Sequence, residues 1–129
     1  MAMNLTLWIA TWVLAAVALL GGITKTFVPK EKIAAHEGGQ WTAQASTGFV
    51  KTLGVLEILA AAGLILPGLL GIAPVMVAVT ALCWAFLMVG AMMTHGRLGQ
   101  VKLVVLTSGY LALAAFIAWG RFGPETLGA

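Results

Sequence analysis

The stretch LGVLEILAAAGLILP, from Leu53 to Pro67, decides how the rest of the chain is interpreted. It is a run of apolar and small residues with the pattern of a helix, and it contains one carboxylate, Glu57. A charged side chain in the hydrocarbon of a bilayer costs about 3 kcal/mol on insertion scales, so Glu57 must face the protein interior, find a partner or hold a proton. Gly54 and Ala61 share a helical face with Glu57, and small residues on such a face allow a second helix to approach closely. We therefore expect Glu57 to point into a helical bundle and to mark the functional site.

The composition is that of a membrane protein. The chain has 129 residues, of which 61% are hydrophobic and 9% are charged, whereas about 25% of the residues of an ordinary soluble domain are charged. Apolar segments near the length of roughly 20 residues that a span requires lie at about 5–25, 49–66, 74–94 and 101–120. The sequence thus predicts an all-α, polytopic membrane protein, a four-transmembrane-helix bundle that forms a single domain over residues 1–129.

Basic residues gather beside two of the three connections between these helices. Six of them flank the first and third connections, namely Lys25, Lys30, Lys32, Lys51, Arg97 and Lys102. The second connection, residues 68–73, carries no charge, and the C-terminal tail contributes only Arg121 as a basic residue. The positive-inside rule then places the first and third connections in the cytoplasm. We expect a multi-pass protein of the bacterial inner membrane with both termini on the non-cytoplasmic side.

The long first connection, residues 27–47, contains a short amphipathic segment. Pro29 is suited to beginning a helix, and Gly38 is suited to ending one. Ile33 falls on the apolar side of this segment, and Trp41 is expected at the membrane interface. The segment either lies along the membrane surface or folds back over the mouth of the bundle.

Four further polar residues are candidates for the same site as Glu57. Lys25 ends the first helix and either extends to the membrane surface or turns inward to the acid. His95 ends the third helix, where it is either a plain helix-terminal cation or a site residue. If Phe49 and Val101 mark the same membrane border, a rise of about 1.5 Å per residue puts both Glu57 and Tyr110 roughly 12 to 14 Å from that border. The two can hydrogen-bond there, and Thr107 lies one turn from Tyr110, although its hydroxyl can instead bond to its own helix.

Other kinds of site are excluded or find no support in the sequence. A single cysteine, Cys83, allows no internal disulfide, which excludes membrane thiol oxidoreductases that use a cysteine pair within one chain. The sequence contains no glycine-rich phosphate loop, no CxxCH haem motif, no metal-spaced Cys/His cluster and no basic and aromatic stripe for nucleic acid. We therefore expect neither a metal nor a nucleic-acid partner.

Taken in order, these features resemble the DoxX-like family of small four-helix membrane proteins. The resemblance runs from about Leu19 to Pro124 and is carried by Lys25 at the end of the first helix, the loop with Pro29 and Trp41, LGVLEILAAAGLILP, GAMMTHGRLG and the final WGRFGP. It implies a four-helix bundle in the inner membrane. The wider DoxX group is redox-associated and includes a subunit of a thiosulfate:quinone oxidoreductase and a mycobacterial membrane complex linked to oxidative stress. The motif of the family selects Lys25, Glu57 and His95, which the charge and depth arguments also select.

Three functions are compatible with these residues. The first is a redox-associated protein that binds a quinone or other isoprenoid lipid between its helices, with Glu57, His95 and Tyr110 at the carbonyls and Lys25 favouring negative charge; it would need a redox partner subunit as electron donor. The second is a membrane isomerase, cyclase or hydratase that uses Glu57 as general acid and His95 or Tyr110 as proton relay. The third is a structural accessory subunit in which Glu57 pairs with Lys25 or Lys102 to fix helix packing. Small residues on the helices also leave room for a homodimer.

Overall fold

The computed structural model describes residues 2–127, and the regular structure within them is helical. Four long helices, each apolar enough to cross a membrane, are α1 (Ala2–Phe27), α3 (Thr47–Leu70), α4 (Val75–Arg97) and α5 (Val101–Phe122). A short helix, α2 (Lys30–Ala34), and a 3-10 helix, η1 (Gln40–Gln44), lie between α1 and α3. The predicted fold class is thus confirmed: the chain is a multi-pass, all-helical membrane protein with a short helical segment in its first connection.

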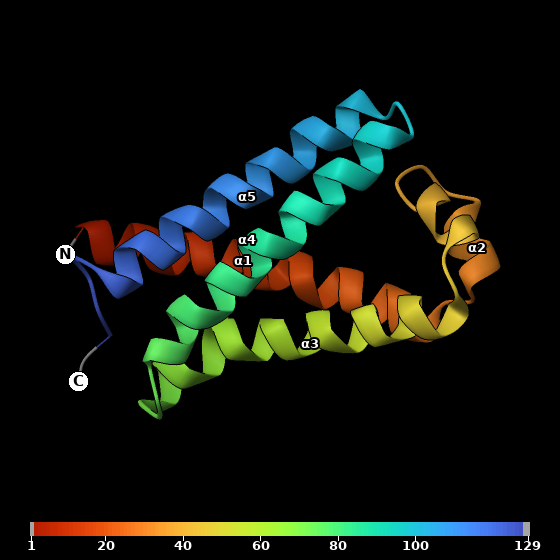
Figure 1. The fold of residues 1–129 in the computed structure, drawn as a ribbon. Helices are drawn as coiled ribbons and strands as arrows, with labels where there is room; N and C mark the ends of the chain where they lie inside the picture. The colour runs from red at the N-terminus through yellow and green to blue at the C-terminus, as the bar shows by residue number, and fades with distance from the viewer. Residues whose placement is uncertain (1, 128–129) are drawn as a thin grey trace.

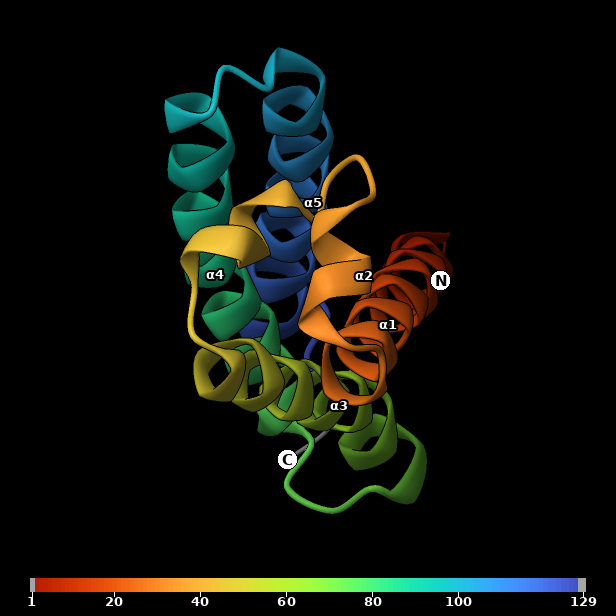
Figure 2. The same cartoon turned by 90° about the vertical axis from the view of Figure 1, so that its right-hand side faces the viewer.

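The four long helices form two pairs. Helix α1 packs along α3 and α4 packs along α5, while contacts between the pairs are fewer. The pairs meet near the α3–α4 turn and separate toward the end of the bundle that carries α2 (Figure 1). There the segment of α2 and η1 folds back over the space between them (Figure 2). The first connection therefore covers one mouth of the bundle. Of the two positions that the sequence allowed for it, this is the one folded back over the mouth, not the one along the membrane surface.

Glycines set the spacing between the helices. A Cβ atom added to Gly22 of α1 would lie 2.7 Å from the carbonyl oxygen of Gly54 in α3. A Cβ atom added to Gly63 of α3 would lie 2.6 Å from the hydroxyl oxygen of Thr80 in α4. Only hydrogen fits at these positions without displacement of the facing helix, so the small residues hold α1 against α3 and α3 against the start of α4.

Helix α3 extends further than the sequence predicted. The expectation ended this helix at residue 66, because Pro67 lacks the N–H that continues the hydrogen-bond ladder. The structure instead carries the helix through Pro67 to Leu70 and ends it at Gly71, which adopts the left-handed conformation with φ of 67°. The helix thus tolerates the backbone hydrogen bond lost at Pro67, and it ends where a left-handed glycine turns the chain.

A second polar cluster joins the two ends of the chain, at the opposite end of the bundle from α2. Arg121 of α5 is only 4% exposed and donates hydrogen bonds from Nη1 to the side-chain oxygen of Asn4 at 2.8 Å and to the backbone oxygen of Glu125 at 2.9 Å. Its guanidinium also lies 5.6 Å from the ring centroid of Trp8, within the range of a cation–π contact. The cluster fastens the end of α5 to the start of α1.

Candidate functional site

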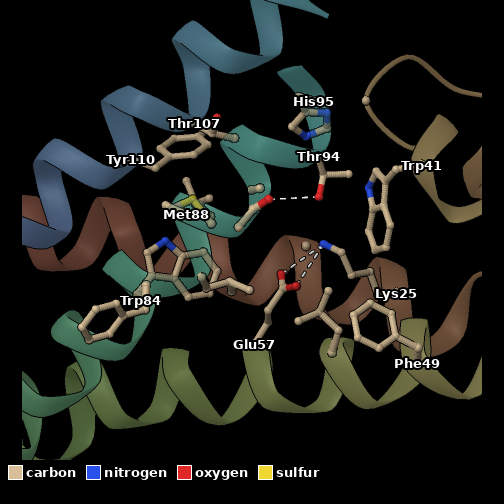
Figure 3. Close-up of a pocket in the computed structure, with 18 residues that line it drawn as sticks. Lys25, Trp41, Phe49, Glu57, Trp84, Met88, Thr94, His95, Thr107 and Tyr110 are labelled. Carbon is tan, nitrogen blue, oxygen red and sulfur yellow. Dashed lines mark hydrogen bonds and ion pairs between the residues drawn. The ribbon is translucent and has the colours of Figure 1, made fainter. Parts of the chain in front are cut away.

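An ion pair between Lys25 and Glu57 lies at the centre of the site. Nζ of Lys25 lies 3.1 Å from each carboxylate oxygen of Glu57 (Figure 3). The side chain of Glu57 is 5% exposed and that of Lys25 is 20% exposed. The expectation that Glu57 faces the interior and finds a basic partner therefore agrees with the structure. Of the two lysines considered as partners, Lys25 rather than Lys102 makes the pair.

The close contact of α1 with α3 positions this pair. The Gly22–Gly54 contact brings the two backbones together one turn from the charged residues, so that a lysine on one helix reaches a carboxylate on the other. Gly21 gives the carboxylate its space, because a Cβ atom at this position would lie 2.8 Å from Oε1 of Glu57. A larger residue at any of these three glycines would change the geometry of the pair.

A cavity of about 450 Å³ adjoins the ion pair. Its walls come from all four long helices, and Gly38 and Trp41 of the first connection also line it, on the side toward α2. Cavities that hold small molecules in proteins measure about 300 to 1,000 Å³ and combine apolar walls with a few polar groups. This cavity has that size and character, since aromatic and aliphatic side chains surround one charged pair.

All five residues predicted for the site line this cavity, namely Lys25, Glu57, His95, Thr107 and Tyr110. Their polar contacts differ from those expected. The Thr107 hydroxyl donates to the backbone oxygens of Leu103 at 2.8 Å and Val104 at 3.1 Å, which is the alternative bond to its own helix. Among the described residues, the hydrogen bonds of Glu57 do not include one to Tyr110, which lines the same cavity. The roles assigned to these residues stay predictions.

His95 links the cavity wall to the covering segment. It is 8% exposed, and its Nδ1 lies 2.8 Å from Oε1 of Gln100, the residue that precedes α5. The amide nitrogen of Gln100 in turn donates to Oε1 of Gln40 in η1. A chain of three polar side chains therefore connects the end of α4 to the segment over the mouth. His95 bonds to this chain rather than to the ion pair.

Two tryptophans of the cavity were missed by the sequence argument. Trp84 is 4% exposed, and its Nε1 has no hydrogen-bond partner among the described residues. Trp41 lies at the mouth, where its ring meets that of Phe49 edge-on at a centroid distance of 6.4 Å and an interplanar angle of 88°. Indoles in membrane proteins are enriched at the interfaces. The position of Trp84 near the middle of α4 was the available signal that this indole has another role.

The comparison with family models agrees with the fold. The model of the DoxX-like family matches residues 9–117, a range that includes every residue lining the cavity. Neither the comparison with curated proteins nor the one with solved structures finds a match. Since the family match covers most of the chain, this four-helix membrane protein belongs to the DoxX-like family.

Proposed function

We propose that this DoxX-like membrane protein binds a quinone or other isoprenoid lipid by its polar head in the cavity beside Glu57. The observation that carries the proposal is the meeting of a charged pair, Glu57 and Lys25, with the aromatic and aliphatic walls of one cavity of about 450 Å³. The ring of a quinone is apolar and suits the hydrocarbon walls of the cavity, while its carbonyl oxygens need hydrogen-bond donors.

The donors in the cavity wall suit a ligand with carbonyl oxygens. A lysine ammonium has three donor hydrogens, and a phenol has one. Lys25 and Tyr110 both line the cavity, so both donors can reach a ligand oxygen. The ring of Trp84 also lines the cavity, but its N–H is fully buried without a partner among the described residues and does not open to the cavity. Lys25 would also stabilise negative charge on a reduced head group.

A redox association is part of this proposal. A quinone gains negative charge when it takes up electrons, and the chain offers the ammonium of Lys25 beside the cavity to stabilise that charge. In this proposal a partner subunit supplies the electrons, and the cavity positions the ring that receives them.

The ion pair favours binding over acid catalysis. A carboxylate that accepts hydrogen bonds from an ammonium is ionised and acts as an acceptor, so it has no proton to donate while the pair is closed. An isomerase, cyclase or hydratase that uses Glu57 as general acid would first have to separate Lys25 from it. A purely structural role explains the pair, but it does not explain the adjoining cavity.

Native mass spectrometry with lipid extraction tests the proposal. Protein purified from its own membranes should retain about one isoprenoid lipid per chain, and Glu57→Gln should lose it because the variant breaks the charge pair at the head site. Glu31→Gln is the matched control, since Glu31 is an exposed carboxylate of α2 that does not line the cavity.

Two results would contradict the proposal. One is wild-type protein that carries no lipid and does not retain added decylubiquinone. The other is a Glu57→Gln variant that keeps the lipid as well as the control does. A loss of folding in Glu57→Gln, read from its thermal unfolding, would instead support the structural role of the pair.

A further inference from the structure

One wall of the cavity is also part of the outer surface of the bundle. Phe49 of α3 and Phe86 of α4 both line the cavity, yet they are 57% and 70% exposed. Helices α3 and α4 are held together where Gly63 meets Thr80, and they separate toward the end that carries α2 (Figure 1). The cavity therefore reaches the face of the bundle that contacts lipid, through the space between α3 and α4.

Gly90 leaves this side of the cavity without a side chain. It lies one helical turn after Phe86, is exposed and lines the cavity. A Cβ atom built at Gly90 would meet no atom within 4 Å. The gap at Gly90 is thus open space rather than a close helix contact, in contrast to Gly54 and Gly63.

We propose that the hydrocarbon tail of the bound lipid leaves the cavity over Gly90, between Phe49 and Phe86, and continues into the bilayer. This inference rests on the proposed function, and it adds the direction of the ligand and its route. The head lies at the Lys25–Glu57 pair, the tail passes between α3 and α4, and the ligand enters sideways from the membrane. Its class is therefore an amphipathic lipid with a hydrocarbon tail rather than a water-soluble molecule.

The opposite side of the cavity does not suit a hydrocarbon tail. Lys25 also borders a second cavity of about 500 Å³, which lies against α2 and the loop that follows it. That cavity is lined by the charged or titratable side chains of Lys32, His36 and Glu37. Burying methylene groups against charges is unfavourable because the charges lose hydration. The gap at Gly90 faces lipid, so its polarity matches that of a hydrocarbon tail.

A tailed and a tail-less quinone distinguish the head site from the route of the tail. Decylubiquinone and the same ring without its alkyl tail are titrated into protein in nanodiscs, with quenching of tryptophan fluorescence as the signal. Gly90→Phe and the β-branched Gly90→Ile fill the gap. Gly109→Phe is the control, because a Cβ atom there also meets nothing within 4 Å and Gly109 does not line the cavity. All three should fold as the wild type does.

A tail route over Gly90 predicts a loss of affinity for the tailed quinone alone. Both Gly90 variants should bind decylubiquinone about tenfold more weakly than wild type, while the tail-less ring and the Gly109 control keep their wild-type affinities. Wild-type affinity of the Gly90 variants for both probes would overturn the route, and so would an equal loss of both probes, which would place the head at Gly90. Failure of both probes to bind wild-type protein would overturn the proposed function together with this inference.

Discussion

The unequal burial of the two partners makes the Lys25–Glu57 pair respond asymmetrically to mutation. Lys25→Met leaves a carboxylate whose side chain is 5% exposed and which lies ten residues into α3. Removing one partner of a buried pair costs about 3 to 5 kcal/mol. Neighbouring polar groups and protonation can partly stabilise the unpaired acid. We therefore expect the free energy of unfolding to fall by about 3 kcal/mol, the lower end of that range.

The reverse substitution is milder. Glu57→Gln leaves an ammonium that is 20% exposed and lies two residues from the end of α1 at Phe27. A lysine at a helix end can extend its charge to the membrane surface, so we expect a loss of about 1 kcal/mol. The double variant should be more stable than Lys25→Met alone, since no unpaired charge is left in the bundle.

The assay is reversible unfolding of the protein in mixed micelles, measured by circular dichroism as the fraction of denaturing detergent increases. Lys32→Met is the control, because Lys32 is exposed and outside the pair; its free energy of unfolding should stay within about 0.5 kcal/mol of wild type. The reasoning is refuted if Glu57→Gln costs as much as Lys25→Met, or if the double variant is less stable than Lys25→Met.

Four other features give predictions of their own. Trp84→Phe keeps an aromatic ring and removes the unpaired N–H, so the midpoint of thermal unfolding should not fall and affinity for decylubiquinone should stay within about twofold of wild type; a larger loss of affinity would show that the N–H reaches the ligand. Gly54→Ala brings a Cβ atom into α1 and should cost about 2 kcal/mol in the same unfolding assay, whereas Gly48→Ala, which meets nothing within 4 Å, should cost nothing. Arg121→Met loses the bonds that join α5 to α1 and should cost about 2 kcal/mol, and an unaltered unfolding curve would show that the cluster is unimportant. A cysteine in place of Ser46, in a cysteine-free background, should react with an impermeant thiol reagent in inverted vesicles but not in intact cells, and the opposite pattern would reverse the predicted orientation.

The sequence predicted those features that depend on one helix at a time. Four apolar segments and one carboxylate among small residues were enough to predict the bundle and the inward direction of Glu57. The separation of the α1–α3 pair from the α4–α5 pair was not predictable, because it depends on how the two pairs pack against each other. The contact of Gln100 with Gln40, 60 residues apart, follows from that separation and has no local pattern. The unpaired N–H of Trp84 is likewise visible only once its neighbours are placed. Pro67 misled the prediction of the end of α3, because the left-handed Gly71 and not the proline ends this helix.

The bond between Asn4 and Arg121 connects residues separated by 117 positions, and this has a consequence for biosynthesis. During translation α1 and α3 emerge first, and they already contain the glycine contact and the ion pair. Helices α4 and α5 follow as a second hairpin with its own packing. The guanidinium meets Asn4 only when α5 has left the ribosome, so this contact between the two hairpins forms last. A nascent chain stopped before Val101 should therefore contain the charged pair but lack Thr107 and Tyr110, which complete the cavity wall.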